Sequence, residues 1–184
     1  MIKQQIFEPS SLVLQSSEPL SVMQLSLLAD EILLFLQSYR PEFALIANLH
    51  RKTGCRVHEL FEASRWQVVN GHSLQITPQK RNAVRLIELA DIGFADAAAL
   101  TPSLNDIGRL PERQYERTFS AGVLSVNLWR LYENGFARPS THFFRHLRIK
   151  ELSAAGFDKS FIATWIGEKN EDNLDYYLNS QYFV

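Results

Sequence analysis

The pair Asn70-Gly71, which separates two short apolar segments, constrains the fold of this chain more than any other feature. Residues 66–69, Trp-Gln-Val-Val, precede the pair, and residues 73–77, Ser-Leu-Gln-Ile-Thr, follow it. Both segments have the alternating or continuous apolar residues of β-strands, and Asn-Gly is the strongest short signal for a hairpin turn. A further strand is expected over residues 83–89. The sequence therefore predicts a small antiparallel sheet.

Helical patterns lie on both sides of this sheet. Ser21 is a candidate N-cap for a helix that ends at Arg40-Pro41, and Pro41 can begin a second helix that ends at Thr53-Gly54. Further helices are expected over residues 57–63, 97–100, 112–133, 143–155 and 158–167. We therefore expect an α+β fold that is mainly α-helical, with the small three-stranded antiparallel sheet packed at one side.

The length and composition indicate one globular unit. A chain of 184 residues with 46% hydrophobic residues can fill one core, and no apolar run approaches the length of a membrane span. Residues 1–18 are Ser-rich and aperiodic, so we expect an extended lead followed by a single domain over residues 19–184. The N-terminus lacks a secretory signal pattern, and the single cysteine, Cys55, suits a reducing cytoplasm.

The formal net charge of -1 hides an uneven distribution of charge. Residues 46–150 carry fifteen basic and nine acidic side chains, whereas the segments before and after them are acidic. This asymmetry would permit a basic surface despite the near-neutral total, although ordinary solvated charge gives the same count.

Neither metal nor nucleotide chemistry is indicated. His50, His58 and His72 lack the spacing of metal ligands, and Cys55 has no second cysteine beside it. The sequence also has no Gly-rich phosphate loop. We therefore expect no metal and no cofactor.

The C-terminal third holds the residues best suited to chemistry. His142 and Arg145 belong to the run His-x-x-Arg-His at the start of the helix expected over residues 143–155. They would lie on one helix face if His142 is in the first turn. An Ile-Gly pair follows at 166–167, and Tyr177 comes ten residues after that glycine.

A second candidate arginine lies far upstream. Residues 53–60 read Thr-Gly-Cys-Arg-Val-His-Glu-Leu, so that Arg56 follows a glycine turn. Glu59, three residues later, can hold the guanidinium or cap the neighbouring backbone. The two segments, in this order, resemble the motifs of the tyrosine recombinase, or phage integrase, family. The resemblance covers nearly the whole chain, from about Pro19 to its end.

This resemblance implies a site-specific DNA recombinase or integrase that cleaves and rejoins DNA strands through a 3′-phosphotyrosine intermediate, without a cofactor. The catalytic residues that it implies are Arg56, Lys80, His142, Arg145, Glu168 and Tyr177. Each arginine can give two parallel hydrogen bonds to phosphate oxygens. Tyr177 would be the nucleophile, and Lys80, in the basic turn over residues 78–82, would protonate the departing 5′-oxygen.

Two of these assignments have close rivals. Arg81 adjoins Lys80, and Tyr176 adjoins Tyr177. Neighbouring helical residues point about 100° apart, so only one of the two tyrosines can reach the phosphate. The count of ten residues from Gly167 selects Tyr177.

Glu168 departs from the family pattern, which has histidine or sometimes tryptophan at this position. A carboxylate would repel the phosphate unless it is protonated or paired with an arginine. The sequence also lacks the separate core-binding domain of most relatives, unless it is part of a longer protein. Two alternatives therefore stay open: a catalytically weak or inactive DNA-binding accessory protein of the same fold, and a DNA-relaxing enzyme that resembles type IB topoisomerases.

The resemblance also implies partners. The first is double-stranded DNA that carries a recombination site, on which the protein would associate with further copies of itself. An accessory DNA-bending or directionality protein could assist. Such a protein would serve a mobile genetic element and would lie with the nucleoid in the cytoplasm, without a membrane partner. Integration, excision and inversion are not distinguished by the sequence.

Overall fold

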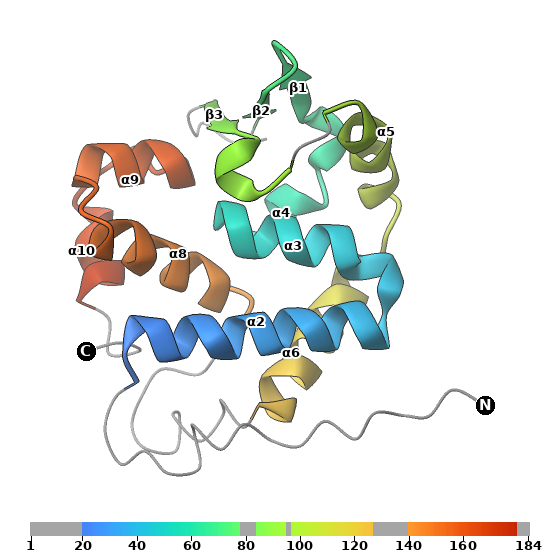
Figure 1. Ribbon diagram of the computed structural model, residues 1–184, viewed down its shortest axis with the longest axis horizontal. Helices are drawn as coiled ribbons and strands as arrows, with labels where there is room; N and C mark the ends of the chain where they lie inside the picture. The colour runs from blue at the N-terminus through green and yellow to red at the C-terminus, as the bar shows by residue number, and fades with distance from the viewer. Residues whose placement is uncertain (1–19, 78–83, 95–96, 127–139, 180–184) are drawn as a thin grey trace.

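The computed structural model of the chain describes residues 20–77, 84–94, 97–126 and 140–179 (Figure 1). Helices predominate in these ranges, and their strands form one antiparallel sheet in the order β1-β2-β3. The predicted α+β fold with mainly α-helical content is therefore confirmed. The lead expected over residues 1–18 lies outside the described ranges. Among the described helices, none combines the length and the apolar character that a membrane crossing requires.

Helix α2, Val22–Tyr39, runs along the lower side of the molecule in Figure 1. Ser21 caps it as predicted: its hydroxyl accepts from the N–H of Gln24, and the Gln24 side chain accepts from the N–H of Ser21. The helix ends before Arg40-Pro41, also as predicted. In the described part of the chain it packs against α3 (Ala44–Thr53), α6 (Glu112–Ser125) and α8 (Phe143–Ala154).

The segment between α2 and the sheet contains short turns of helix. A 3₁₀ turn, η1 (Pro41–Phe43), leads into α3, which ends at Gly54 as predicted. The prediction of a single helix over residues 57–63 is wrong. The structure has the short helix α4 (Val57–Leu60), followed by a 3₁₀ turn, η2 (Ala63–Arg65). The split arises because backbone N–H groups after α4 donate to carbonyls three residues back instead of four.

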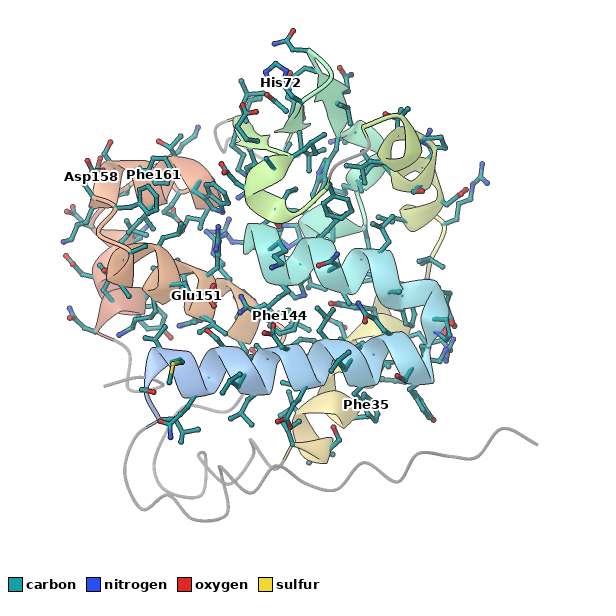
Figure 2. All side chains as sticks on the ribbon, viewed as in Figure 1. Phe35, His72, Phe144, Glu151, Asp158 and Phe161 are labelled. Carbon is teal, nitrogen blue, oxygen red and sulfur yellow. The ribbon has the colours of Figure 1, made fainter. Side chains whose placement is uncertain are left out.

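The sheet consists of β1 (Gln67–Val69), β2 (Ser73–Ile76) and β3 (Arg85–Glu88). Asn70 and Gly71 have φ angles of 54° and 74°, which are the left-handed conformations that this pair favours in a hairpin turn. The predicted hairpin and the third strand are therefore confirmed. The sheet lies at the top of the molecule in Figure 1, and His72 marks the hairpin tip in Figure 2.

Helix α5, Ala97–Ile107, contradicts the prediction that a helix ends at Leu100. The helix continues through Pro102, although proline lacks the N–H of a regular helical residue. Leu100, Leu104 and Ile107 are buried at helical spacing, and α5 packs against η2 and β1. Burial of this apolar face therefore outweighs the local preference of proline.

Helix α6 begins at Glu112 as predicted but ends at Ser125 instead of Glu133. The hydroxyl of Ser125 donates to the carbonyl of Gly122 at 2.7 Å, and the N–H of Val126 donates to the same carbonyl at 3.3 Å. These bonds satisfy a carbonyl of the last turn. Residues 127–139, which include the rest of the predicted helix, lie outside the described ranges.

The C-terminal helices α8, α9 (Lys159–Ile166) and α10 (Asn173–Leu178) group at one end of the molecule in Figure 1. The boundaries predicted for α8 and α9 are confirmed to within one residue. The carboxylate of Asp158 caps α9 by accepting from the N–H of Phe161 at 2.7 Å, and Gly167 ends that helix. Figure 2 shows Asp158 and Phe161 at the outer side of this group.

An aromatic cluster fills the core where α8 meets α3 and α6. The ring of Phe144, labelled in Figure 2, lies 5.0 Å from that of Phe119 and 5.2 Å from that of His50. Nδ1 of His50 is 2.9 Å from the hydroxyl of Tyr115. Burial, assisted by His142, lowers the pKa of His50 to about 3, so this ring is neutral at pH 7. His50 is therefore a core residue.

Polar contacts fix the orientation of α8. Glu151 (Figure 2) accepts from Nη2 of Arg51 on α3 at 2.6 Å and from the hydroxyl of Ser26 on α2 at 2.6 Å. The guanidinium of Arg148 lies over the Trp165 ring of α9, 4.7 Å from its centroid. These contacts hold α8 between α2, α3 and α9, with its N-terminal turn toward the segment before α4.

Candidate active site

The residues that the family resemblance implies come from three regions of the chain. The described ones are, in chain order, Arg56 before α4, His142 and Arg145 at the start of α8, Glu168 after α9 and Tyr177 on α10. Lys80 and its rival Arg81 lie outside the described ranges. The structure brings the described residues together around one buried guanidinium.

That guanidinium belongs to Arg145, the largest fully buried side chain in the described part of the protein. Its Nη1 donates to the carbonyl oxygens of Gly54 and Ile166, at 3.0 and 2.9 Å. Its Nη2 lies 3.5 Å from Oε2 of Glu168. Arg145 therefore joins the turn before Arg56 to the turn after α9, although Gly54 is 91 residues away in sequence.

The carboxylate of Glu168 lies between two arginines. Its Oε2 accepts a hydrogen bond from Nη2 of Arg56 at 3.0 Å, in addition to its contact with Arg145. Its Oε1 accepts from Nδ2 of Asn173 at 3.1 Å, and the Glu168 side chain is only 12% exposed. The pairing offsets the repulsion that a lone carboxylate would exert on a phosphate, but it also occupies donors that a phosphate would use.

Glu59 takes the second of the two roles left open by the sequence. Its Oε2 accepts from the backbone N–H of Arg56 at 2.8 Å, and the same oxygen pairs with Nη2 of Arg85 at 2.9 Å. Arg85 also contacts the thiol of Cys55 at 3.1 Å and the carbonyl of Trp165 at 3.4 Å. Both members of the ion pair are almost fully buried. The pair therefore fixes the start of α4, and with it Arg56, against α9.

Gly167 allows Arg85 to reach this position. The backbone of Gly167 has a φ of 70°, and a Cβ atom there would lie 3.1 Å from Nη1 of Arg85. Any other residue would strain the backbone and press on the buried guanidinium. The Ile-Gly pair after α9 therefore has a packing role beside the site.

Acid should destabilise the fold through Glu59. Burial disfavours its charge, but Arg85, the N–H of Arg56 and Arg145 outweigh burial, so the pKa of Glu59 is lowered in the folded protein. A lowered folded-state pKa contributes stability that is present above the unfolded-state value of 4.5 and is lost as pH falls through the folded-state value. We expect the free energy of unfolding, measured by urea titration, to fall as the pH drops below the unfolded-state value of 4.5.

The matched variant is Glu59→Gln, which leaves Arg85 buried without its anion. We expect it to be about 3 kcal/mol less stable than the parent at pH 7, with a flatter dependence on pH in acid. A variant with the parent's stability and the parent's slope would contradict this role for Glu59.

His142 lies at the N-cap of α8 and is exposed. Desolvation lowers the pKa of His142, and the charges of Arg145, Arg56 and His58 lower it further. The charges of both site arginines therefore favour the neutral ring. The neutral form offers one hydrogen-bond donor and one acceptor at the start of α8, three residues before Arg145.

The two candidate tyrosines face different surroundings. The ring centroid of Tyr177 lies 5.6 Å from the guanidinium carbon of Arg145. Tyr176 is 69% exposed. Tyr177 is therefore the tyrosine beside the buried arginine.

The ring of His146 also packs against Tyr177. The two rings lie 4.7 Å apart, and His146 is 4% exposed. Burial, together with His142 and Arg145, lowers the pKa of His146 to about 4. A neutral, polar ring therefore packs against the tyrosine at pH 7.

Sequence reasoning assigned no role to His146 or Arg85. For Arg85 a signal exists, because alternation along β3 places it on the same face as the buried Ile87 and Leu89. A charged residue on the core face of a strand indicates a buried partner. For His146 the sequence offers only its place directly after Arg145.

Two solved structures resemble this chain in fold. One is the crystal structure of XerA recombinase, with a TM-score of 0.57 and 15% sequence identity, covering 82% of this chain and 57% of that chain. The other is the crystal structure of a lambda integrase dimer bound to a COC′ core site, with a TM-score of 0.56 and 17% identity, covering 89% of this chain and 49% of that chain. The present chain thus spans about half the length of either. No protein-family profile and no curated protein sequence matches it.

Both of these proteins are tyrosine recombinases. The chain therefore has a tyrosine recombinase fold, which is mainly α-helical with a small three-stranded antiparallel sheet.

Proposed function

We propose that residues 19–184 form the catalytic domain of a site-specific DNA recombinase or integrase, which cleaves and rejoins duplex DNA through a 3′-phosphotyrosine intermediate. The residues assigned to the site are Arg56, Lys80, His142, Arg145, Glu168 and Tyr177. The fold supports a DNA-acting protein of this class, and the geometry of the arginines and the tyrosine supports the chemistry.

One observation carries the proposal: two arginines from distant segments converge on a single anionic oxygen beside a tyrosine. Arg56 and Arg145 both direct Nη2 at Oε2 of Glu168. Two guanidinium groups that share one oxygen make a site for a tetrahedral oxyanion such as a phosphodiester. Tyr177 lies against one of these groups, where an attacking nucleophile is needed.

In the proposed reaction the phenolic oxygen of Tyr177, having lost its proton, attacks phosphorus, and the bond from phosphorus to the 5′-oxygen breaks. Arg56 and Arg145 stabilise the charge that grows on the non-bridging oxygens. His142 adds a hydrogen-bond donor, and Lys80 gives a proton to the 5′-oxygen. The products are a 3′-phosphotyrosine and a 5′-hydroxyl. Attack by a 5′-hydroxyl of another strand reverses the step and frees the tyrosine.

The proposed partner is double-stranded DNA that carries a recombination site, with further copies of the chain bound to the same DNA. The lambda integrase of the comparison is a dimer bound to a core site, which supports both parts of this proposal. An accessory DNA-bending or directionality protein would act on the assembled complex.

Arg56→Ala should reduce cleavage far more than binding, because its charge is most needed when the transition state forms. We expect the rate of adduct formation to fall by about 10²–10³-fold. Binding of a labelled duplex, measured by anisotropy, should weaken much less and should keep a steep dependence on salt.

Arg113→Ala is the matched control, because Arg113 is an exposed arginine on α6. It removes the same charge without touching the arginine pair, so bound DNA should be cleaved at the parent's rate. Equal losses of cleavage in the two variants would mean that Arg56 acts only through general charge.

The pairing of Glu168 favours one rival, a DNA-binding accessory protein without strand-cleaving activity. In that case the carboxylate would neutralise the arginines permanently. Such a protein would bind its DNA site but form no covalent adduct on any substrate. A different assay distinguishes a topoisomerase-like enzyme from a recombinase. The topoisomerase-like enzyme would relax a supercoiled plasmid that lacks the recombination site.

A further inference from the structure

Glu168 is an internal hydrogen-bond acceptor for both site arginines, Arg56 and Arg145. Its Oε2 lies 3.0 Å from Nη2 of Arg56 and 3.5 Å from Nη2 of Arg145. A carboxylate oxygen in this place has the charge and the hydrogen-bonding capacity of a non-bridging phosphate oxygen. The two anions therefore require the same donors.

The rest of Arg145 cannot serve a second anion. Its Nη1 is engaged by two backbone carbonyls, its Nε has no hydrogen-bond partner in the described part of the chain but is buried away from solvent, and its side chain has no exposed surface. The approach that the structure leaves is the Nη2 side, where Glu168 lies. Arg56, by contrast, is 23% exposed and lies at the rim of the site. An external anion that contacts both arginines must therefore take the place of the Glu168 carboxylate.

We propose that Glu168 is an internal competitor for DNA phosphate: its carboxylate occupies the arginine pair in the DNA-free protein and is displaced when a phosphodiester binds. The proposal rests on the proposed function, since it takes the incoming anion to be the phosphodiester. It assigns to Glu168 a role in controlling access to the site, distinct from the hydrogen-bond donor that histidine or tryptophan would supply at this position.

The second oxygen of Glu168 links this exchange to the helix of the nucleophile. Its Oε1 accepts from Nδ2 of Asn173, the first residue of α10. Asn173 and Tyr177 are four residues apart and share one face of that helix. Displacement of the carboxylate by phosphate would release or redirect this contact, so the start of α10 is coupled to the occupancy of the arginine pair.

The test compares phosphate binding by the full chain and by Glu168→Gln, which keeps the shape and an acceptor oxygen for Asn173 but removes the charge. The probe is inorganic phosphate at constant ionic strength, with Tm and calorimetric titration as readouts. In the parent, only the molecules in which Glu168 has left the arginines can bind phosphate, so the apparent affinity for phosphate is lower than the affinity of the open site. Glu168→Gln increases the fraction of molecules with an open site, so its apparent affinity for phosphate is higher. We expect phosphate to bind about tenfold more tightly to Glu168→Gln and to raise its Tm more than the parent's.

Glu171→Gln is the control, because it removes the same charge from the same turn at an exposed position away from the arginines. It should bind phosphate as the parent does. In the double variant Glu168→Gln/Arg56→Ala, the gain should disappear, which locates the bound phosphate at the arginine pair. Glu168→Asp, with a shorter reach to the arginines, should fall between the parent and Glu168→Gln.

A purely structural role for Glu168 predicts the opposite pattern. Glu168→Gln would then be less stable and would bind phosphate no better than the parent, and that outcome overturns the proposal. If Glu168→Gln folds poorly in a chloride buffer, the proposal requires that it fold better in a phosphate buffer of the same ionic strength. An equal folded fraction in the chloride and phosphate buffers contradicts the proposal.

The experiment separates this inference from the proposed function. Tighter phosphate binding without any DNA adduct would support the competitor and refute strand cleavage. Adduct formation by the parent, combined with unchanged phosphate affinity in Glu168→Gln, would support strand cleavage and refute the competitor.

Discussion

Tyr177→Phe should abolish the covalent protein–DNA adduct, whereas Tyr176→Phe should retain it. The first change removes the hydroxyl of the tyrosine beside Arg145, and no other group in the proposed mechanism forms the bond to phosphorus. The second removes the hydroxyl of a residue that is 69% exposed. Adducts are measured on denaturing gels after incubation with a nicked duplex that traps the intermediate.

The two tyrosine variants are controls for each other. Both lose one hydroxyl from neighbouring positions of α10, so both should fold and bind DNA with nearly the affinity of the parent. The reverse result, an adduct with Tyr177→Phe and none with Tyr176→Phe, would shift the register after Gly167 by one residue. The assignment of Glu168 would then move with it.

Arg145→Ala should lower both the stability of the protein and its cleavage of DNA. The change leaves the carbonyls of Gly54 and Ile166 without their donor in a buried place, and Glu168 loses one of its cations. Breaking a buried charged network of this kind costs about 3–5 kcal/mol. We expect a decrease of that size in the free energy of unfolding from urea titrations, and no adduct under conditions in which the variant is still folded.

Arg145→Lys separates the two effects. It keeps the positive charge but not the planar fork that reaches two carbonyls and an anion at once. We expect it to be more stable than Arg145→Ala and still to cleave poorly. Unchanged cleavage in Arg145→Ala would disprove the two-arginine clamp, and unchanged stability would contradict the structural contacts of this side chain.

The sequence predicts well where a short segment decides the structure. Ser21 and Asp158 have the capping chemistry that begins α2 and α9, because in each the side-chain oxygen accepts a hydrogen bond from the backbone N–H three residues later. Asn70-Gly71 has the positive φ angles of the hairpin turn. These signals act within a few residues, so a single sequence contains them in full.

Prediction fails where distant contacts outweigh a local preference. Pro102 favours the end of a helix, yet α5 continues because its apolar face is buried against η2 and β1. The helix expected over residues 57–63 ends at Leu60, and the 3₁₀ turn η2 then leads into β1. The residues next to Pro102 do not reveal which distant elements will cover α5.

The candidate site shows the same division. The motifs identify Arg56 and Arg145, but the partners of these arginines depend on the folded chain. Arg56 and Glu168 are 112 residues apart, and Arg85 reaches the carbonyl of Trp165 from 80 residues away. The sequence could show that Glu168 needs an arginine. The structure supplies two.

The central claim, that Tyr177 becomes covalently linked to DNA, is tested most directly by mapping the adduct itself. The full chain would be incubated with a nicked duplex from its own genomic neighbourhood that carries the recombination site, then digested, and the nucleotide-bearing peptide would be sequenced by mass spectrometry. The account predicts a 3′-phosphate linked to Tyr177. A linkage to Tyr176 or to any other residue, or the absence of an adduct on this substrate, would contradict it.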